Sequence, residues 1–310
     1  NAIAIGTLAG ENAQVDYGVA MGREAGMNFQ GGNAVAIGRV AGKTSQGINC
    51  IAVGYLAGST GQEYSSVAIG VAAAQDGQGE ECVAVGRYAG KDAQGDYATA
   101  VGPYAGQTSQ GAQGVAVGVN AGQADQGGNS VAIGNRAGSY SQGYNSVAIG
   151  YDTGATDQNN YAIAVGYQAG CNAQGVSTVA IGNLAGRNAQ ADASVAIGNQ
   201  AARHTQGDYA IAVGNAAGCN AQGDYSVAVG YAAGCADQGA SAVAIGDAAG
   251  RNAQGSSTTA VGDNAGLNAQ GNKSVAVGHY AGQASQGGNA VAIGDVAGSN
   301  AQGVSSTAVG

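Results

Sequence analysis

A short pattern in which β-branched residues alternate with small ones returns every sixteen residues along the chain. It reads Asn-Ala-Ile-Ala-Ile-Gly at residues 1–6 and Asn-Ser-Val-Ala-Ile-Gly at residues 145–150. We number the repeat positions 1 to 16 from Asn1. Position 3 is almost always valine or isoleucine, position 4 is always alanine, and position 14 is glutamine in every complete copy. The chain is therefore a tandem array of one unit.

The local pattern predicts strands and corners. Alternation over positions 2–5 is typical of a short β-strand, and the glycines at positions 6, 10 and 15 indicate turns. A helix is disfavoured because each interior glycine costs ~1 kcal/mol. We therefore predict an all-β fold, a parallel β-solenoid with sixteen residues per coil. We expect residues 1–310 to form a single continuous array of twenty repeats, the last incomplete, that belongs to a longer chain.

The distribution of charge predicts which positions are interior. Every Asp, Glu, Lys and Arg falls outside positions 2–6, 9, 10 and 14, and unpaired charges are almost never fully buried. We expect positions 3 and 5 to supply a Val/Ile core, and the position 14 amides to bond from coil to coil inside the solenoid. The alternative is an exposed corner glutamine kept by turn preference. The predicted ladder includes Gln14, Gln30, Gln46, Gln142, Gln158 and Gln302.

Positions 2 and 4 would then point away from that core. They carry only small, uncharged residues, which indicates close approach by another copy of the chain. The alternative is that a flat Ala/Ser face is merely tolerated. The predicted contact residues between chains include Ala116, Ala132, Ala148, Ser130 and Ser146.

The stretches Asn-Ser-Val-Ala-Ile-Gly at residues 129–134 and 145–150 resemble the repeat of YadA-type heads, the head domains of trimeric autotransporter adhesins. The resemblance implies a left-handed β-roll, a homotrimeric rod and attachment at a cell surface. We therefore expect an extracellular structural or adhesive fibre that presents binding surfaces away from a cell or virion. An ice- or mineral-binding solenoid and a self-stacking filament without a specific receptor are the alternatives.

The expected partners follow from charge and from the tyrosines. A net charge of −9 disfavours nucleic acid, and no run of ~20 apolar residues predicts membrane insertion in this segment. We expect the chain to bind itself, as a trimer, a higher assembly or an end-to-end filament, and to bind a host surface protein or glycan. Corner tyrosines either contact such a ligand or pack between coils or chains. The candidate ligand-contact tyrosines are Tyr55, Tyr97, Tyr151, Tyr161, Tyr167, Tyr209, Tyr225 and Tyr231.

Other chemistry is sparse. His204 and His279 occupy different repeat positions nearly five coils apart, so no shared metal site is expected. No catalytic triad, phosphate loop or carboxylate pair stands out, and we predict no enzyme, metal or cofactor. Cys219 and Cys235 share position 11 in adjacent repeats, which places their Cα atoms within reach of a disulfide. Asn272 opens the one glycosylation sequon of the chain and is a candidate glycosylation site.

Overall fold

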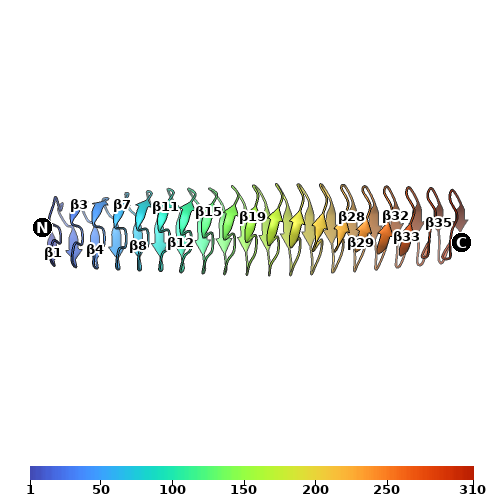
Figure 1. The fold of residues 1–310 in the computed structure, drawn as a ribbon, viewed down its shortest axis with the longest axis horizontal. Helices are drawn as coiled ribbons and strands as arrows, with labels where there is room; N and C mark the ends of the chain where they lie inside the picture. Colours follow the sequence, from blue (N-terminus) through green and yellow to red (C-terminus); the bar gives the residue numbers. More distant parts are fainter. The chain divides into compact units, whose positions relative to one another are not determined.

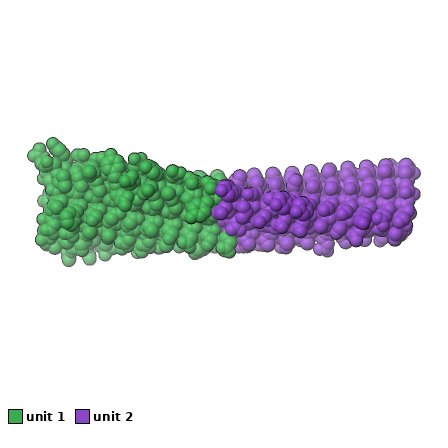
Figure 2. All heavy atoms as spheres, turned by 90° about the horizontal axis from the view of Figure 1, so that it is seen from above, with its two compact units in different colours: residues 1–157 green, residues 158–310 purple.

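A computed structural model describes residues 1–310, which divide into two compact units, residues 1–157 and residues 158–310 (Figure 2). The predicted fold class is confirmed: the chain is an all-β, parallel β-solenoid of about 19 turns with sixteen residues per coil. It contains no helix long and apolar enough to cross a membrane.

Each coil of unit 1 contributes short strands to two parallel sheets (Figure 1). We call the sheet of positions 3–5 the aliphatic sheet and the sheet of positions 12–14 the glutamine sheet. In unit 1 the aliphatic sheet comprises β1 (Ile3–Ile5), β2 (Val19–Met21), β4 (Val35–Ile37), β6 (Ile51–Val53), β8 (Val67–Ile69), β10 (Val83–Val85), β12 (Thr99–Val101), β14 (Val115–Val117), β16 (Val131–Ile133) and β18 (Val147–Ile149). The glutamine sheet comprises β3 (Asn28–Gln30), β5 (Thr44–Gln46), β7 (Thr60–Gln62), β9 (Asp76–Gln78), β11 (Asp92–Gln94), β13 (Thr108–Gln110), β15 (Ala124–Gln126) and β17 (Tyr140–Gln142).

Unit 2 repeats this arrangement, and β19 (Thr156–Gln158) lies where the division falls. The aliphatic sheet of unit 2 comprises β20 (Ile163–Val165), β22 (Val179–Ile181), β24 (Val195–Ile197), β26 (Ile211–Val213), β28 (Val227–Val229), β30 (Val243–Ile245), β32 (Thr259–Val261), β34 (Val275–Val277), β35 (Val291–Ile293) and β36 (Thr307–Val309). Its glutamine sheet comprises β21 (Asn172–Gln174), β23 (Asn188–Gln190), β25 (Thr205–Gln206), β27 (Ala221–Gln222), β29 (Ala236–Gln238), β31 (Asn252–Gln254) and β33 (Asn268–Gln270).

Within each unit the strands pair in register with those one repeat away. Val131 pairs with Val147 in unit 1, and Val179 pairs with Val195 in unit 2. Hydrogen bonding continues through the corners, because the Gly26 N–H donates to the Ala41 carbonyl at 2.9 Å. Backbone groups are thereby satisfied from coil to coil, and equal repeat positions form columns along each unit.

Glycine and left-handed residues make the corners between the strands. Residues at positions 1 and 8 adopt positive φ in coil after coil, as at Tyr97 (61°) and Tyr88 (60°), a conformation that is uncommon outside glycine. Gly22 at position 6 has φ 131°, and a Cβ there would lie 2.6 Å from the Gly38 carbonyl oxygen. Only glycine allows the coils to stack this closely at position 6.

Alanine methyl groups and glutamine amides fill the interior of each unit. Ala84 at position 4 and Ala89 at position 9 are fully buried, and their equivalents form the alanine core of each unit. A Cβ added to Gly90 would lie 2.7 Å from the Gln94 Oε1 and 3.3 Å from the Ala84 Cβ. The space between the two sheets is therefore narrow, and the largest side chain other than glutamine that it buries completely is threonine, as at Thr153.

The prediction of a Val/Ile core at positions 3 and 5 is wrong. Ile133 is 39% exposed, whereas Ala132 beside it in the same strand is fully buried. Side chains alternate between the two faces of the strand as predicted, but the alanines face inward and the branched residues face outward. Two short strands joined by tight corners lie so close that only small side chains and planar amides fit between them, so valine and isoleucine point outward.

Candidate interaction surfaces

The outer surface of the aliphatic sheet is a continuous array of branched side chains. We call the outward residues at positions 3 and 5 the aliphatic face. In unit 1, Ile133 and Ile149 are 39% and 37% exposed. In unit 2, Ile181 and Ile197 repeat the arrangement with the same register. No charged residue occupies positions 3 or 5, so the aliphatic face carries no formal charge.

The predicted contact residues at positions 2 and 4 do not lie on the surface. The structure buries all of them completely inside their own coil. The Ser146 hydroxyl donates to the Gly143 carbonyl at 2.7 Å, so it serves the corner of its own chain. That prediction is wrong because these residues are small to fit a thin interior, not to admit a neighbouring chain. They are Ala116, Ala132, Ala148, Ser130 and Ser146.

The glutamines of position 14 are interior. Gln30 and Gln46 are buried, and Gln14, at the first coil, is partly buried. The Gln14 amide donates to the Gln30 Oε1 at 3.0 Å, and the Gln30 amide donates to the Gln46 Oε1 at 3.2 Å. Each amide also donates to backbone carbonyls, as Gln30 does to Val19 at 2.9 Å. The exposed-corner alternative therefore does not describe these side chains.

The later members of the predicted ladder are also held inside. Gln142 is buried and donates to the Val131 carbonyl at 2.9 Å. Gln158 is buried and donates to the Ala162 carbonyl at 3.2 Å. Gln302, in the last complete repeat, donates to the Val291 carbonyl at 2.8 Å.

The candidate tyrosines lie along two borders of the aliphatic sheet and do not form one patch. Position 1 precedes the strand of the aliphatic sheet, and position 7 follows it. Tyr209 and Tyr225 at position 1 stack with ring centroids 5.2 Å apart. At position 7 the Arg39 guanidinium lies 5.2 Å from the Tyr55 ring centroid. All the candidates are exposed: Tyr55, Tyr97, Tyr151, Tyr161, Tyr167, Tyr209, Tyr225 and Tyr231.

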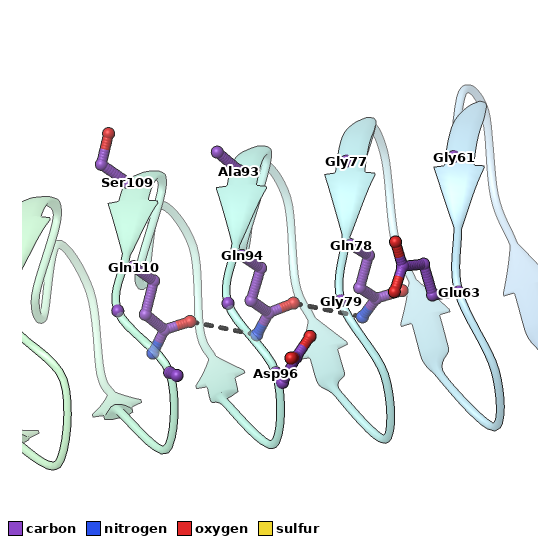
Figure 3. Close-up of a pocket in the computed structure, with 13 residues that line it drawn as sticks. Gly61, Glu63, Gly77, Gln78, Gly79, Ala93, Gln94, Asp96, Ser109 and Gln110 are labelled. Carbon is purple, nitrogen blue, oxygen red and sulfur yellow. Dashed lines mark hydrogen bonds between the residues drawn. The ribbon is translucent and has the colours of Figure 1, made fainter.

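Sequence reasoning missed a groove on the glutamine sheet of unit 1 (Figure 3). It has a volume of about 540 Å³, with a floor of small residues at positions 13 and 15 such as Gly77 and Ala93. The carboxylates of Glu63 and Asp96 line it, and the Asp96 Oδ1 accepts the Glu80 N–H at 3.1 Å. The run of small residues at position 13 in these repeats was the available signal. The groove is a shallow trough that carries the carboxylates of Glu63 and Asp96 and the side chain of Ser109.

The five cysteines fall into an interior class and an outward class. Cys50 and Cys82 replace the small interior residue of position 2 and are fully buried. Burial raises the pKa of the Cys82 thiol to about 11. Cys219 and Cys235 lie at an outward corner and are free thiols, so the structure does not contain the predicted disulfide. The two thiols nevertheless interact directly.

The remaining polar candidates lie apart. His279 is placed between Asp295, at 2.8 Å from its Nδ1, and Asp263, at 3.7 Å from its Nε2. His204 lies 3.4 Å from the Asn188 amide nitrogen and does not join His279. No group of three or more His, Cys, Asp or Glu residues is placed to hold a metal ion. Asn272 is exposed, and its Oδ1 accepts the Ser256 N–H at 2.9 Å.

Comparison with known families agrees with the repeat and the fold. Residues 141–169 and residues 206–233 match the YadA head domain repeat, as two copies. No curated protein matches the chain. The chain carries YadA-like head repeats, here with a period of sixteen residues in a parallel β-solenoid. The match supports an adhesin-like structural fibre at a cell surface.

Proposed function

We propose that this chain is a stretch of an extracellular fibre, structural and adhesive, in which three copies associate through their aliphatic faces. The observation that carries the proposal is an uncharged array of outward valines and isoleucines beside an interior made of alanine. Large exposed apolar surfaces of this kind mark interaction sites. The match to a head domain repeat supports the same class of function.

The energetics favour burial of this face. A branched aliphatic side chain contributes about 1.5–3 kcal/mol when it is fully buried. Ile133 and Ile149 retain more than a third of their exposure in the single chain. The fully buried alanines contribute much less each, because they have only one methyl group. Association would cover two branched side chains in every coil, and the gain would add up along the array.

Further copies of the same chain are the partner that fits. The rows of the aliphatic face repeat with the coil spacing, about 4.8 Å. Another copy presents branched side chains with that same spacing, so ridges and hollows match along the whole contact. The absence of charge at positions 3 and 5 also permits like faces to meet without repulsion. We take the number three from the adhesin heads that the repeat resembles.

The adhesive surface then consists of what such a trimer leaves exposed. The tyrosines of positions 1 and 7 border the aliphatic face, and the glutamine sheet with its acidic groove lies on the other side of the coil. Exposed tyrosine rings stack on sugars and pack against protein ligands. We propose a host surface protein or glycan as the ligand of these borders.

The test is the mass of the chain in solution. Sedimentation equilibrium of the 29.5 kDa chain should give a trimer. Ile133→Lys with Ile149→Lys should yield monomers, because buried ammonium groups would lack partners. Ser141→Lys is the matched control, since Ser141 is exposed on the glutamine sheet in the same coil as Ile133, and it should remain trimeric. A monomeric wild-type chain would contradict the proposal.

The same samples test the alternatives and the adhesive part. A monomeric wild-type chain that produces thermal hysteresis would favour an ice-binding solenoid. A wild-type trimer that binds an immobilised panel of glycans and matrix proteins, and loses that binding with Tyr209→Ala and Tyr225→Ala, would support the proposed ligand class. A trimer that binds nothing on the panel would reduce the proposal to a structural fibre.

A further inference from the structure

One column of unit 2 combines thiols and guanidinium groups. Position 11 carries Arg187, Arg203, Cys219, Cys235 and Arg251 in successive repeats. Position 11 lies just before the strand of the glutamine sheet, away from the aliphatic face, and both cysteines are half-buried. The column is therefore accessible whether or not the aliphatic faces associate, and its chemistry is independent of the proposed function.

The backbone holds the two cysteines side by side. The Gly218 N–H donates to the Ala233 carbonyl, and the Asn220 N–H donates to the Cys235 carbonyl, both at 2.9 Å. The residues on either side of Cys219 are thus bonded to the next coil. The Cys219 Sγ also lies 3.6 Å from the Cys235 carbonyl oxygen. Adjacent in-register strands are about 4.8 Å apart, inside the 4.4–6.8 Å Cα range that disulfides use.

The two sulfur atoms have different protonation properties. The neighbouring Cys219 thiol lowers the pKa of Cys235, and the Arg251 guanidinium lowers it further. The same interaction raises the pKa of Cys219. Cys235 is therefore the more acidic thiol of the pair, and a thiolate is the attacking group in thiol–disulfide exchange.

We propose that Cys219 and Cys235 are a redox-active dithiol that reacts with low-molecular-weight disulfides of the glutathione class and closes as a disulfide between adjacent coils. The Cys235 thiolate attacks one sulfur of the small disulfide, forms a mixed disulfide and releases one small thiolate. Cys219 then loses its proton to solvent and attacks the Cys235 sulfur. This step forms the bond between coils and releases the second small thiolate, so one small disulfide is reduced for each protein disulfide formed.

The other cysteines of the chain are built-in controls. Cys50 and Cys82 are fully buried and two coils apart, with Ser66 at the intervening position 2. Cys171 shares position 11, but the next repeat places Arg187 there. Neither Cys50 with Cys82 nor Cys171 has a thiol one coil away in its column. Closure within the folded chain should therefore be confined to Cys219 and Cys235.

The experiment equilibrates the reduced, folded chain with glutathione buffers of increasing oxidised fraction. The reaction is quenched with acid, the remaining thiols are alkylated in denaturant so that buried thiols are labelled too, and the chain is digested with trypsin. Residues 204–251 form one tryptic peptide with Cys219 and Cys235, residues 44–87 carry Cys50 and Cys82, and residues 137–187 carry Cys171. The first peptide should lose both alkyl labels and two hydrogen atoms. The peptide of residues 44–87 should keep both labels across the same buffers.

A variant with two distant thiols tests whether closure requires the thiols to lie in adjacent coils or only to be reactive. Cys235→Ser with Arg251→Cys places the two thiols of the column two coils apart, about 9–10 Å. This variant should stop at mixed disulfides with glutathione. The proposal is overturned if the wild-type peptide keeps both labels in the most oxidising buffer, if disulfide-linked dimers form instead, or if the separated pair closes equally well.

Discussion

Unit 1 and unit 2 use the same repeat, but the glutamine ladder differs between them. In unit 1 every position 14 amide from Gln14 to Gln126 donates to the Oε1 of the next glutamine, at 3.0–3.2 Å. In unit 2 the ladder is interrupted, and four Oε1 atoms are buried without a partner, those of Gln174, Gln206, Gln238 and Gln254. An identical residue in every repeat therefore does not ensure an identical bond.

Two of these interruptions coincide with a change of backbone conformation. Most residues at position 13 have positive φ, but Thr205, Ala221, Ser285 and Ala301 do not, and β25 and β27 are shortened to two residues. The breaks before Gln206 and after Gln222 fall at such a change, yet the change between Ala269 and Ser285 leaves the bond from Gln270 to Gln286 intact at 3.2 Å. The backbone change alone therefore does not account for the breaks, and nothing in the structure explains the one between Gln238 and Gln254.

The glutamine side chain at position 14 has two roles, bonding to the backbone and bonding to the next glutamine. Gln238 still donates to the Val227 carbonyl at 2.9 Å and to the Ala242 carbonyl at 3.2 Å. Gln94 makes the equivalent backbone bonds to Val83 and Ala98, and in addition the amide bond to Gln110 at 3.0 Å. Bonding to the backbone is thus common to both units, and the amide–amide bond is the part that varies.

The largest expected effect is the loss of a ladder glutamine in unit 1. Gln94→Leu removes the backbone bonds, takes one acceptor from the Gln78 amide and leaves the buried Gln110 Oε1 without its donor, whereas Gln238→Leu removes backbone bonds from a site where the ladder is already broken. Because each unsatisfied buried group costs ~1–3 kcal/mol, Gln94→Leu should destabilise its unit by about that much more. Hydrogen exchange of the affected coils and the thermal midpoint would measure this. Equal losses in the two variants would show that the amide–amide bonds contribute nothing.

A second pair of substitutions should destabilise the two units by the same amount. Ala84→Leu in unit 1 and Ala228→Leu in unit 2 both place a large side chain at a fully buried position 4. Overpacking costs about 1–3 kcal/mol, and the alanine columns of the two units are equivalent, so both variants should lose the same stability in thermal unfolding. Val83→Leu, on the outward side of the same strand as Ala84, is the matched control and should change the midpoint little. Unequal losses of stability in the two variants would mean that the alanine cores of the two units differ as well.

The smallest expected effect concerns pH and the Cys82 thiol of unit 1. Burial raises the pKa of Cys82 to about 11, above the ~8.5 of a free thiol. A raised pKa means that the contribution to stability is complete below the unfolded value and is lost as pH rises toward the folded one. Unit 1 should therefore weaken between about pH 8.5 and about pH 11. Cys82→Ser should remove that component, since serine is common at position 2; Cys171→Ser, at an outward corner of unit 2, should leave it intact.

The sixteen-residue period of the sequence predicts the fold, and the residue types at each repeat position also indicate which positions are interior. Alanine at every position 4, small residues at position 2 and glutamine at every position 14 all mark buried positions. Hydrophobicity alone selects the wrong face, because the rule that large apolar residues lie inside assumes an interior wide enough to hold them. The variation at positions 3 and 5, where Met21 and Thr99 occur, fits an outward position, whereas the constancy of alanine fits a confined one.

The surfaces are harder to predict than the columns. Adjacent repeats place Cys219 beside Cys235, and the structure agrees on proximity. The acidity of the Cys235 thiol depends on the neighbouring Cys219 thiol and on Arg251, and no local sequence pattern contains that information. The groove beside Glu63 and Asp96 depends on the shape that several small residues leave together. Such shapes appear only once the coils are stacked.

The close glycine stack at position 6 has a consequence for how such a chain can change in length. A Cβ on Gly22 would collide with the Gly38 carbonyl, so each coil fixes the placement of the next to within a fraction of an ångström. A gene that gains or loses a whole repeat preserves every column and changes length by one coil, about 4.8 Å. A gain of a single residue would shift every later side chain into the wrong column. Length can therefore vary in discrete steps by recombination between repeats, while the spacing within a repeat cannot drift.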